Sequence, residues 1–116
     1  MNVAILRGRL SSPPREQQLA SGDRLVSLEV TTRVEHGPAD SVPVAWFPGS
    51  GPTPAWEAGQ EVVVVGRVRR RFFRAGGATA SRTEVVASSV VAANRRAATS
   101  KALDAVVSAV RDAVDA

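Results

Sequence analysis

Hydrophobic and polar residues alternate along several segments of the first 91 residues, which is the pattern of strands that bury one face. The clearest segment is Leu25 to Glu35, where Val26, Leu28, Val30 and Val34 alternate with polar residues. This alternation and the turn residues between segments predict five strands, over Val3–Leu10, Leu25–Glu35, Ser41–Phe47, Glu61 to about Arg74, and Thr83–Val91. Five short strands in this order predict a mainly β fold, a small barrel or sandwich.

Proline and glycine mark the breaks between these strands. Pro43 cannot donate a ladder hydrogen bond, so the third strand is expected to lie at a sheet edge or to carry a bulge. The stretch Pro48–Pro54 is a loop by composition, followed by at most one helical turn at Ala55–Ala58. Gly76-Gly77 predicts the tip of a hairpin. Trp56 is expected to plug the barrel, because tryptophan is usually well buried.

From Ser100 to Ala116 the hydrophobic period changes to that of a helix. The apolar residues of one narrow stripe are Leu103, Val106, Val107, Val110 and Val114. Thr99 or Ser100 is the expected N-cap. The sequence thus predicts a β domain over residues 1–94 and a helical segment over residues 95–116, whose stripe packs on the barrel or on a neighbouring subunit.

Composition narrows the chemistry. The chain has 116 residues, no cysteine and a single histidine, His36. These counts exclude a disulfide scaffold, a thiol nucleophile and a cysteine-ligated metal, and we expect no cofactor. The longest aliphatic run, Val62–Val65, is far shorter than the roughly 20 residues that span a membrane, so we expect a cytoplasmic protein. The acidic residues form no pair of the catalytic kind, and we do not expect an enzyme.

Positive charge is concentrated in one segment. The net charge is +4, and all of the 15 basic residues except Lys101 are arginine. Residues 61–90 hold six arginines and two acids, whereas residues 31–60 hold one arginine and three acids. A positive excess on one segment indicates an anionic partner at one surface.

The fourth predicted strand carries the pattern that bears on function. Because side chains on a strand alternate between faces, Arg67, Arg69, Arg71 and Phe73 share the side opposite the aliphatic residues. Cations then repeat roughly every 6.5–7 Å, with an aromatic ring at the end. Arginine neutralises phosphates and an aromatic ring stacks on any base, so this face fits single-stranded nucleic acid. A second interpretation stays open, in which the arginines are solvated surface and Phe73 is a structural residue.

Five segments of residues 2–91 form one ordered set: Asn2–Leu10, with its N-x-V-x-L-x-G-x-L character, Arg24–Thr32, Ser41–Phe47, Gly59–Phe73 and Thr83-Glu84-Val85. In these segments the chain resembles bacterial single-stranded-DNA-binding proteins of the OB-fold type. The resemblance implies a five-stranded OB-fold barrel. It also implies binding with little sequence preference, in DNA replication, repair or recombination, near the nucleoid.

The resemblance is carried over residue by residue. Arg69, Arg71 and Phe73 match positions on the family's DNA face. A further stacking position matches Phe47, or Trp46 after a shift of one residue; Phe47 is preferred because the alternation puts Trp46 inside the barrel. The expected nucleic-acid-binding residues are Arg33, His36, Phe47, Trp46, Arg67, Arg69, Arg71, Phe73 and Arg74.

Departures from the family shape the expected partners. One family tryptophan falls near Ser41, which cannot stack, so we expect weaker binding or a smaller site. The helix replaces the family's acidic tail, so recruitment of other proteins through a tail is not expected. The partners are single-stranded DNA, with RNA left open, and further copies of the chain in a homodimer or homotetramer, without a membrane. The alternative is an OB-fold protein-interaction or replication-accessory module with weak or no nucleic-acid binding.

Overall fold

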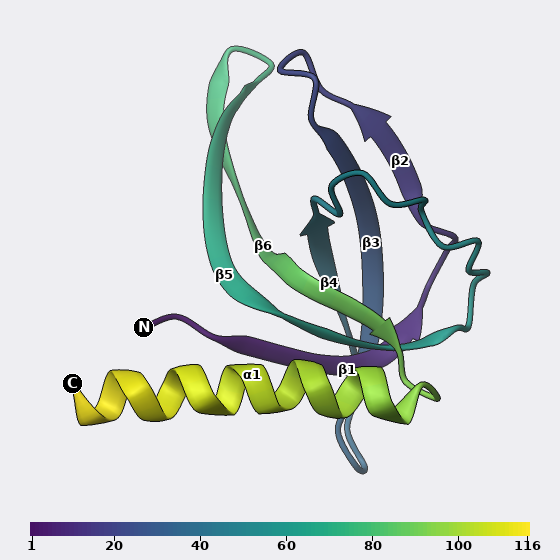
Figure 1. Cartoon of the computed structure of the whole chain (residues 1–116). Coiled ribbons are helices and arrows are strands. Elements are labelled where there is room, and N and C mark those ends of the chain that lie inside the picture. Colours follow the sequence, from purple (N-terminus) through teal and green to yellow (C-terminus); the bar gives the residue numbers. More distant parts are fainter.

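A computed structural model describes all 116 residues and consists of one curled sheet and one helix (Figure 1). The strands are β1 (Ala4–Leu10), β2 (Arg15–Gln18), β3 (Arg24–Arg33), β4 (Ala39–Trp46), β5 (Glu61–Ala75) and β6 (Ala78–Ala92), and the helix is α1 (Arg96–Asp115). The sheet order is β1-β5-β6-β4-β3-β2, and β1 also pairs with β3 through Arg9 and Leu10. This second pairing closes five strands into a barrel. The expected mainly β fold, a five-stranded barrel with a C-terminal helix, is confirmed.

The barrel interior is filled by the alternating residues that the sequence singles out. Val26, Val30, Val62 and Val64 are completely or almost completely buried, and they belong to one cluster with residues of β1, β4 and β6. Partners across the sheet share a face, so the pairing of Leu28 with Val44 and of Val44 with Val85 carries the apolar lining from strand to strand. The opposite face of β5 and β6 is partly covered by α1 in the barrel, where Val63 and Val65 are buried, and is free of the helix further along the two strands.

Asn2 marks the point where β5 leaves the barrel. Its side-chain amide donates to the carbonyl of Val68 at 2.6 Å and accepts from the amide of Val68 at 2.9 Å, which extends the ladder that ends with the pairing of Ala4 and Gly66. Beyond Val68 the only neighbour of β5 is β6, and the two strands continue as a ribbon (Figure 1). We call residues 69–84 the arm. Gly76 and Gly77 form its tip, both with positive φ, as a two-residue hairpin turn requires.

Two tryptophans close one end of the barrel. Trp56 packs against the core and stacks on Trp46, with ring centroids 6.5 Å apart and planes 11° apart. The expected role of Trp56 as a plug is therefore confirmed. The helical turn expected at Ala55–Ala58 is absent, because the chain there runs irregularly to a turn at Ala58 and Gly59. The stacked indole rings, rather than a helix, hold this segment against the barrel.

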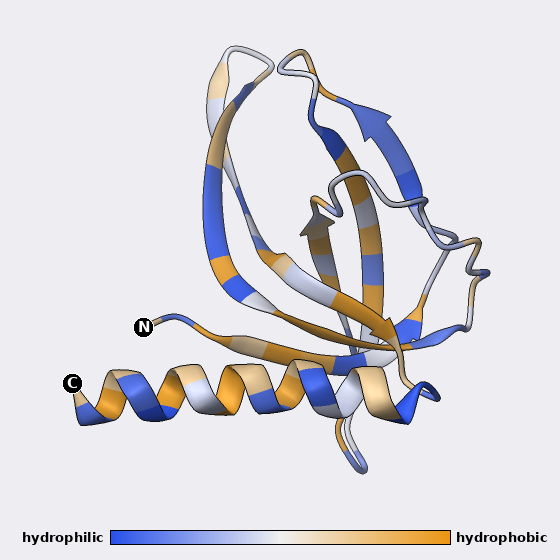
Figure 2. Ribbon diagram, viewed as in Figure 1, coloured by the Kyte–Doolittle hydropathy of each residue, from blue (hydrophilic) through white to orange (hydrophobic).

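The helix α1 lies along β1 and packs against β5 and β6 (Figure 1). It begins four residues earlier than expected, and no side chain caps it, so the N-cap predicted at Thr99 or Ser100 is wrong. None of its residues is fully buried, and Val107, Val110 and Val114 are exposed. Figure 2 shows its hydrophobic residues between polar ones along the whole length. No helix of the structure combines the length and the apolar character needed to cross a membrane.

Three details of the strands differ from the sequence-based expectations. The short strand β2, which pairs with β3, was not expected, because its four residues Arg15–Gln18 are all polar and all exposed. The strand β6 begins at Ala78 rather than Thr83, since it follows β5 along the whole arm. The strand β4 lies between β3 and β6, not at an edge; its pairing with β6 starts only at Val44, so Pro43 needs no partner on that side.

Candidate nucleic-acid interface

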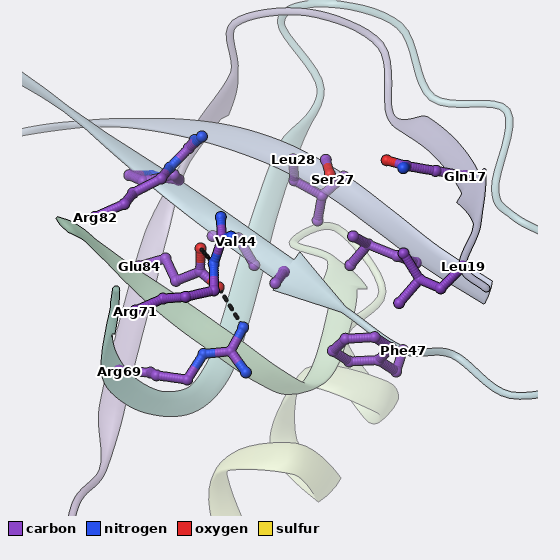
Figure 3. Close-up of a pocket in the computed structure, with 13 residues that line it drawn as sticks. Gln17, Leu19, Ser27, Leu28, Val44, Phe47, Arg69, Arg71, Arg82 and Glu84 are labelled. Atoms are coloured by element: carbon purple, nitrogen blue, oxygen red, sulfur yellow. Dashed lines mark hydrogen bonds and ion pairs between the residues drawn. The ribbon is translucent and has the colours of Figure 1, made fainter. Parts of the chain in front are cut away.

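The outer face of the sheet is hollowed where the arm stands beside β3 and β4 (Figure 3). We call this hollow, of about 510 Å³, the central groove. Gln17, Leu19, Ser27 and Phe47 line one side, and residues of β5 and β6 line the other. No residue of α1 contributes to it. The central groove is open on its outer side, so an extended ligand could lie across the sheet within it.

Phe47 stands at one end of the central groove, directly after the last residue of β4. Its side chain is exposed and faces Arg69 across the groove (Figure 3). Trp46 points the other way, into the barrel, where it stacks on Trp56. The alternation of β4 thus separates the two rings: Phe47 is free to receive a base, whereas the face of Trp46 is already covered.

Arg69 and Arg71 lie on the groove side of β5 and share one carboxylate. Glu84, which pairs directly with Arg69 across the two strands, accepts a hydrogen bond from Nη2 of Arg69 at 2.5 Å. Its other oxygen lies 3.6 Å from Nε of Arg71. The Glu84 side chain is only 7% exposed, against 33% for Arg69 and 46% for Arg71. The two guanidinium groups are therefore held in place from below while their outer atoms face the groove.

Arg82 is a groove residue that the sequence analysis did not select. It pairs directly with Arg71 on the neighbouring strand and takes part in none of the ion pairs of the protein. Two like charges directly opposite each other on a sheet repel, which favours an external anion between them. The signal was present in the sequence, because in a hairpin that turns at Gly76-Gly77 residue 82 falls opposite residue 71.

A second hollow adjoins the central groove on the side of β2. This side hollow, of about 620 Å³, is lined by polar residues that include Ser12, Arg15 and Glu29. Arg82 lines both hollows and so stands between them. The acids of the side hollow already have partners: Glu16 lies 3.2 Å from Nε of Arg24, and Glu29 accepts a hydrogen bond from the hydroxyl of Ser41. Arg82 forms no ion pair with either acid, although Glu29, whose partner Ser41 is neutral, still adds a negative charge to the side hollow.

Phe73 lies further along the arm, on the same side as Arg71. The guanidinium carbon of Arg71 is 5.2 Å from the centroid of the Phe73 ring, within the range of a cation–π contact. The Phe73 side chain remains exposed, at 37%. Together with Phe47, this places an aromatic ring on either side of the arginines Arg69 and Arg71.

The remaining expected residues lie elsewhere. Arg33 ends β3 and His36 forms the exposed turn that follows, with φ of 61°, at the end of the barrel opposite the arm tip (Figure 1). Arg67 lines a separate small hollow with Val106 of α1. Arg74 donates to the carbonyl of Gly77 at 3.1 Å and supports the tip turn. The expected set is therefore divided: Phe47, Arg69, Arg71 and Phe73 follow one surface, and the other expected residues lie away from it.

The charges and rings of this surface define the kind of ligand that it fits. No group of three or more histidine, aspartate or glutamate side chains lies close enough to hold a metal ion. Three arginines and one buried glutamate line the central groove, so its charge is positive. Guanidinium groups beside exposed rings can hold phosphates and stack bases. The geometry fits an extended polyanion that carries flat rings.

Comparison with known proteins agrees with the fold. No protein-family model matches the chain, and no curated protein sequence matches it significantly. Among solved structures, the chain is similar to one described as the Plasmodium falciparum SSB complex with ssDNA, with a TM-score of 0.63 and 16% sequence identity. The match covers 79% of this chain and 94% of that chain. The chain therefore has an OB fold like that of a single-stranded-DNA-binding protein, whereas membership of the bacterial family is not shown.

Proposed function

We propose that this protein binds single-stranded DNA with little sequence preference, along the central groove and the groove side of the arm. The observation that carries the proposal is the placement of Phe47 opposite Arg69 and Arg71 in one open hollow. The rings of Phe47 and Phe73 can each stack on a base of any kind, and the guanidinium groups of the arginines can pair with phosphates. The similarity to the Plasmodium complex supports the same proposal through its fold.

The shape of the groove favours a single strand over a duplex. Proteins that read duplex DNA usually place a helix or a two-stranded ribbon in a groove of the double helix, and the arm is a ribbon of this kind, so the exposed rings decide between the two partners. Here the single helix α1 contributes nothing to the central groove, and the stacking rings need unpaired bases. RNA remains a partner of the same chemistry, since stacking and phosphate contact do not depend on the sugar.

The biological setting belongs to the same proposal. A protein that covers single strands would act in DNA replication, repair or recombination, in the cytoplasm beside the nucleoid, and as a binding protein rather than an enzyme. We propose that it does so as a homodimer or homotetramer. An apolar hollow of about 280 Å³ between β1 and α1, lined by Val3, Ile5, Val107 and Val110, supports self-association.

The alternative function is an OB-fold module that binds proteins, and the same apolar hollow is the observation that favours it. A titration separates the two functions. Fluorescently labelled oligo-dT is titrated with the protein at low salt, and unlabelled mixed-sequence single strands and duplexes compete. The proposal predicts equal competition by the single strands and weak competition by the duplexes. An absence of binding at low salt would favour the protein-binding module.

A further inference from the structure

The arm carries an arginine–aromatic pair on each of its two faces. Side chains of β5 alternate, so Arg69, Arg71 and Phe73 lie on the groove side, which we call the front face. The back face carries Arg70, Phe72 and Arg74. The guanidinium carbon of Arg70 lies 5.3 Å from the centroid of the Phe72 ring, which repeats the 5.2 Å contact between Arg71 and Phe73 on the front face.

The back face has no partner within the protein. The Phe72 side chain is 63% exposed, compared with 37% for Phe73. Since the arm is a two-stranded ribbon beyond the barrel, no core lies behind it on which this ring could pack. Within the protein only the Arg70 guanidinium group contacts this ring, so most of the ring surface is open to a ligand.

The charge of the back face identifies the kind of partner. The residues opposite Arg70, Phe72 and Arg74 on β6 are Thr83, Ser81 and Thr79, so this face carries two cations and no acid. The one acid of the arm, Glu84, pairs with the front-face arginines. Nε and Nη2 of Arg70 lie 3.3 and 3.2 Å from the Ser81 hydroxyl, which holds the guanidinium group beside the ring without neutralising it.

We propose that the back face is a second nucleic-acid site, which binds a further stretch of the same single strand that occupies the central groove. A base stacks on Phe72, and Arg70 holds an adjoining phosphate. The strand therefore passes around the arm rather than ending beside it. This inference rests on the proposed function. It adds that the binding affinity depends on the length of the DNA, which a site confined to the central groove would not require.

Length is the variable that separates the two sites. Between Arg69 and the tip the arm extends roughly 20 Å, at about 3.3 Å per residue. A short oligonucleotide that fills the groove cannot also reach the back face, whereas a longer one can pass around the arm. We therefore compare oligo-dT strands of increasing length by fluorescence anisotropy, using wild-type protein and the double variant Arg70→Gln/Phe72→Ala. Arg96→Gln, at the start of α1, controls for the loss of one exposed arginine.

The proposal predicts that the double variant binds the shortest dT strands like the wild type and binds long strands about tenfold or more weakly. The length of DNA occluded by each protein molecule should also be smaller for the double variant.

Unaltered binding at every length, or an equal loss at every length, would overturn the proposal. The proposal would also be overturned if light scattering without DNA showed a dimer of the wild type and a monomer of the double variant. The back face would then be a contact between protein subunits. Circular dichroism and the thermal midpoint confirm that the variant folds. Wild-type protein that binds no dT of any length would instead refute the proposed function.

Discussion

Glu84 lies directly across from Arg69 on the neighbouring strand, and its buried carboxylate accepts the 2.5 Å hydrogen bond that fixes this guanidinium group beneath the central groove. The same carboxylate attracts Arg71. A buried acid in the middle of a row of arginines orders the row, and it also cancels one of the charges that the row could offer to phosphates. Glu84 therefore stabilises the arrangement of the site at some expense of affinity.

Replacement of Glu84 by glutamine should separate these two effects. Glutamine keeps the shape and can still accept a hydrogen bond from Arg69, but it carries no charge. We expect affinity for oligo-dT to rise several-fold and the log–log salt slope to steepen by about 0.7, one additional phosphate. The free energy of unfolding in urea should fall by about 1–2 kcal/mol because a charged hydrogen bond is lost. Weaker binding by Glu84→Gln would show that this acid only helps the site.

Phe47 and Trp46 are adjacent in sequence, yet they should respond in opposite ways. Phe47→Ala removes an exposed ring of the groove, so affinity should fall by about 1–3 kcal/mol while urea stability changes little. Trp46→Ala removes a ring stacked on Trp56 against the core and should cost about 3 kcal/mol of stability. Binding titrations and urea melts on both variants test this contrast. If Trp46→Phe kept full stability but lost affinity, the assignment of the two faces would be reversed.

Arg82 should contribute to binding although no sequence motif marks it. Arg82→Gln removes the unpaired cation between the central groove and the side hollow. We expect weaker binding of oligo-dT and a salt slope shallower by about 0.7, with unfolding unchanged or slightly more costly because the repulsion from Arg71 is relieved. Arg96→Gln is the matched control. Equal salt slopes for both variants would remove Arg82 from the interface.

Gly66 should be intolerant of any side chain. A Cβ at this position would collide with the carbonyl of Val86, where the paired strands β5 and β6 lie close together and a bulge in β6 accommodates the extra residue Ser88. We expect Gly66→Ala to lower stability by about 1–3 kcal/mol in urea unfolding, because the strands must separate. Gly51→Ala, where a Cβ would meet nothing within 4 Å, serves as the control. Equal stability of the two variants would contradict the close approach of β5 and β6 at Gly66.

The sequence predicted the parts of this fold that depend on alternation. Val26, Leu28 and Val30 alternate so regularly that one register alone buries them, and the glycine pair at residues 76 and 77 fixes the hairpin tip. The strand β2 could not be predicted in this way, because an exposed edge strand has no buried face to mark it. The pairing between β1 and β3 that closes the barrel likewise could not be predicted, because the residue pattern of neither strand indicates its partner.

The candidate site was predicted only where it follows from one strand. The positions of Arg69, Arg71 and Phe73 on one face required nothing beyond the period of β5. The buried glutamate below them and Arg82 beside them come from β6, so their proximity depends on the register of the hairpin. We expected Arg33 and His36 on the same surface, but no predicted strand pairing connected them to β5. The structure places both residues at the far end of the barrel.

The central claim is that the arginines of the front face bind a polynucleotide through its phosphates. The most direct measurement is the binding constant for fluorescent oligo-dT over a series of salt concentrations, for the wild type and for Arg69→Gln/Arg71→Gln. The account predicts that affinity of the wild type falls steeply with salt, and that the double variant binds more weakly with a slope reduced by about 1.4, two phosphates. Wild-type binding that is indifferent to salt, or a double variant with an unchanged slope, would contradict the account.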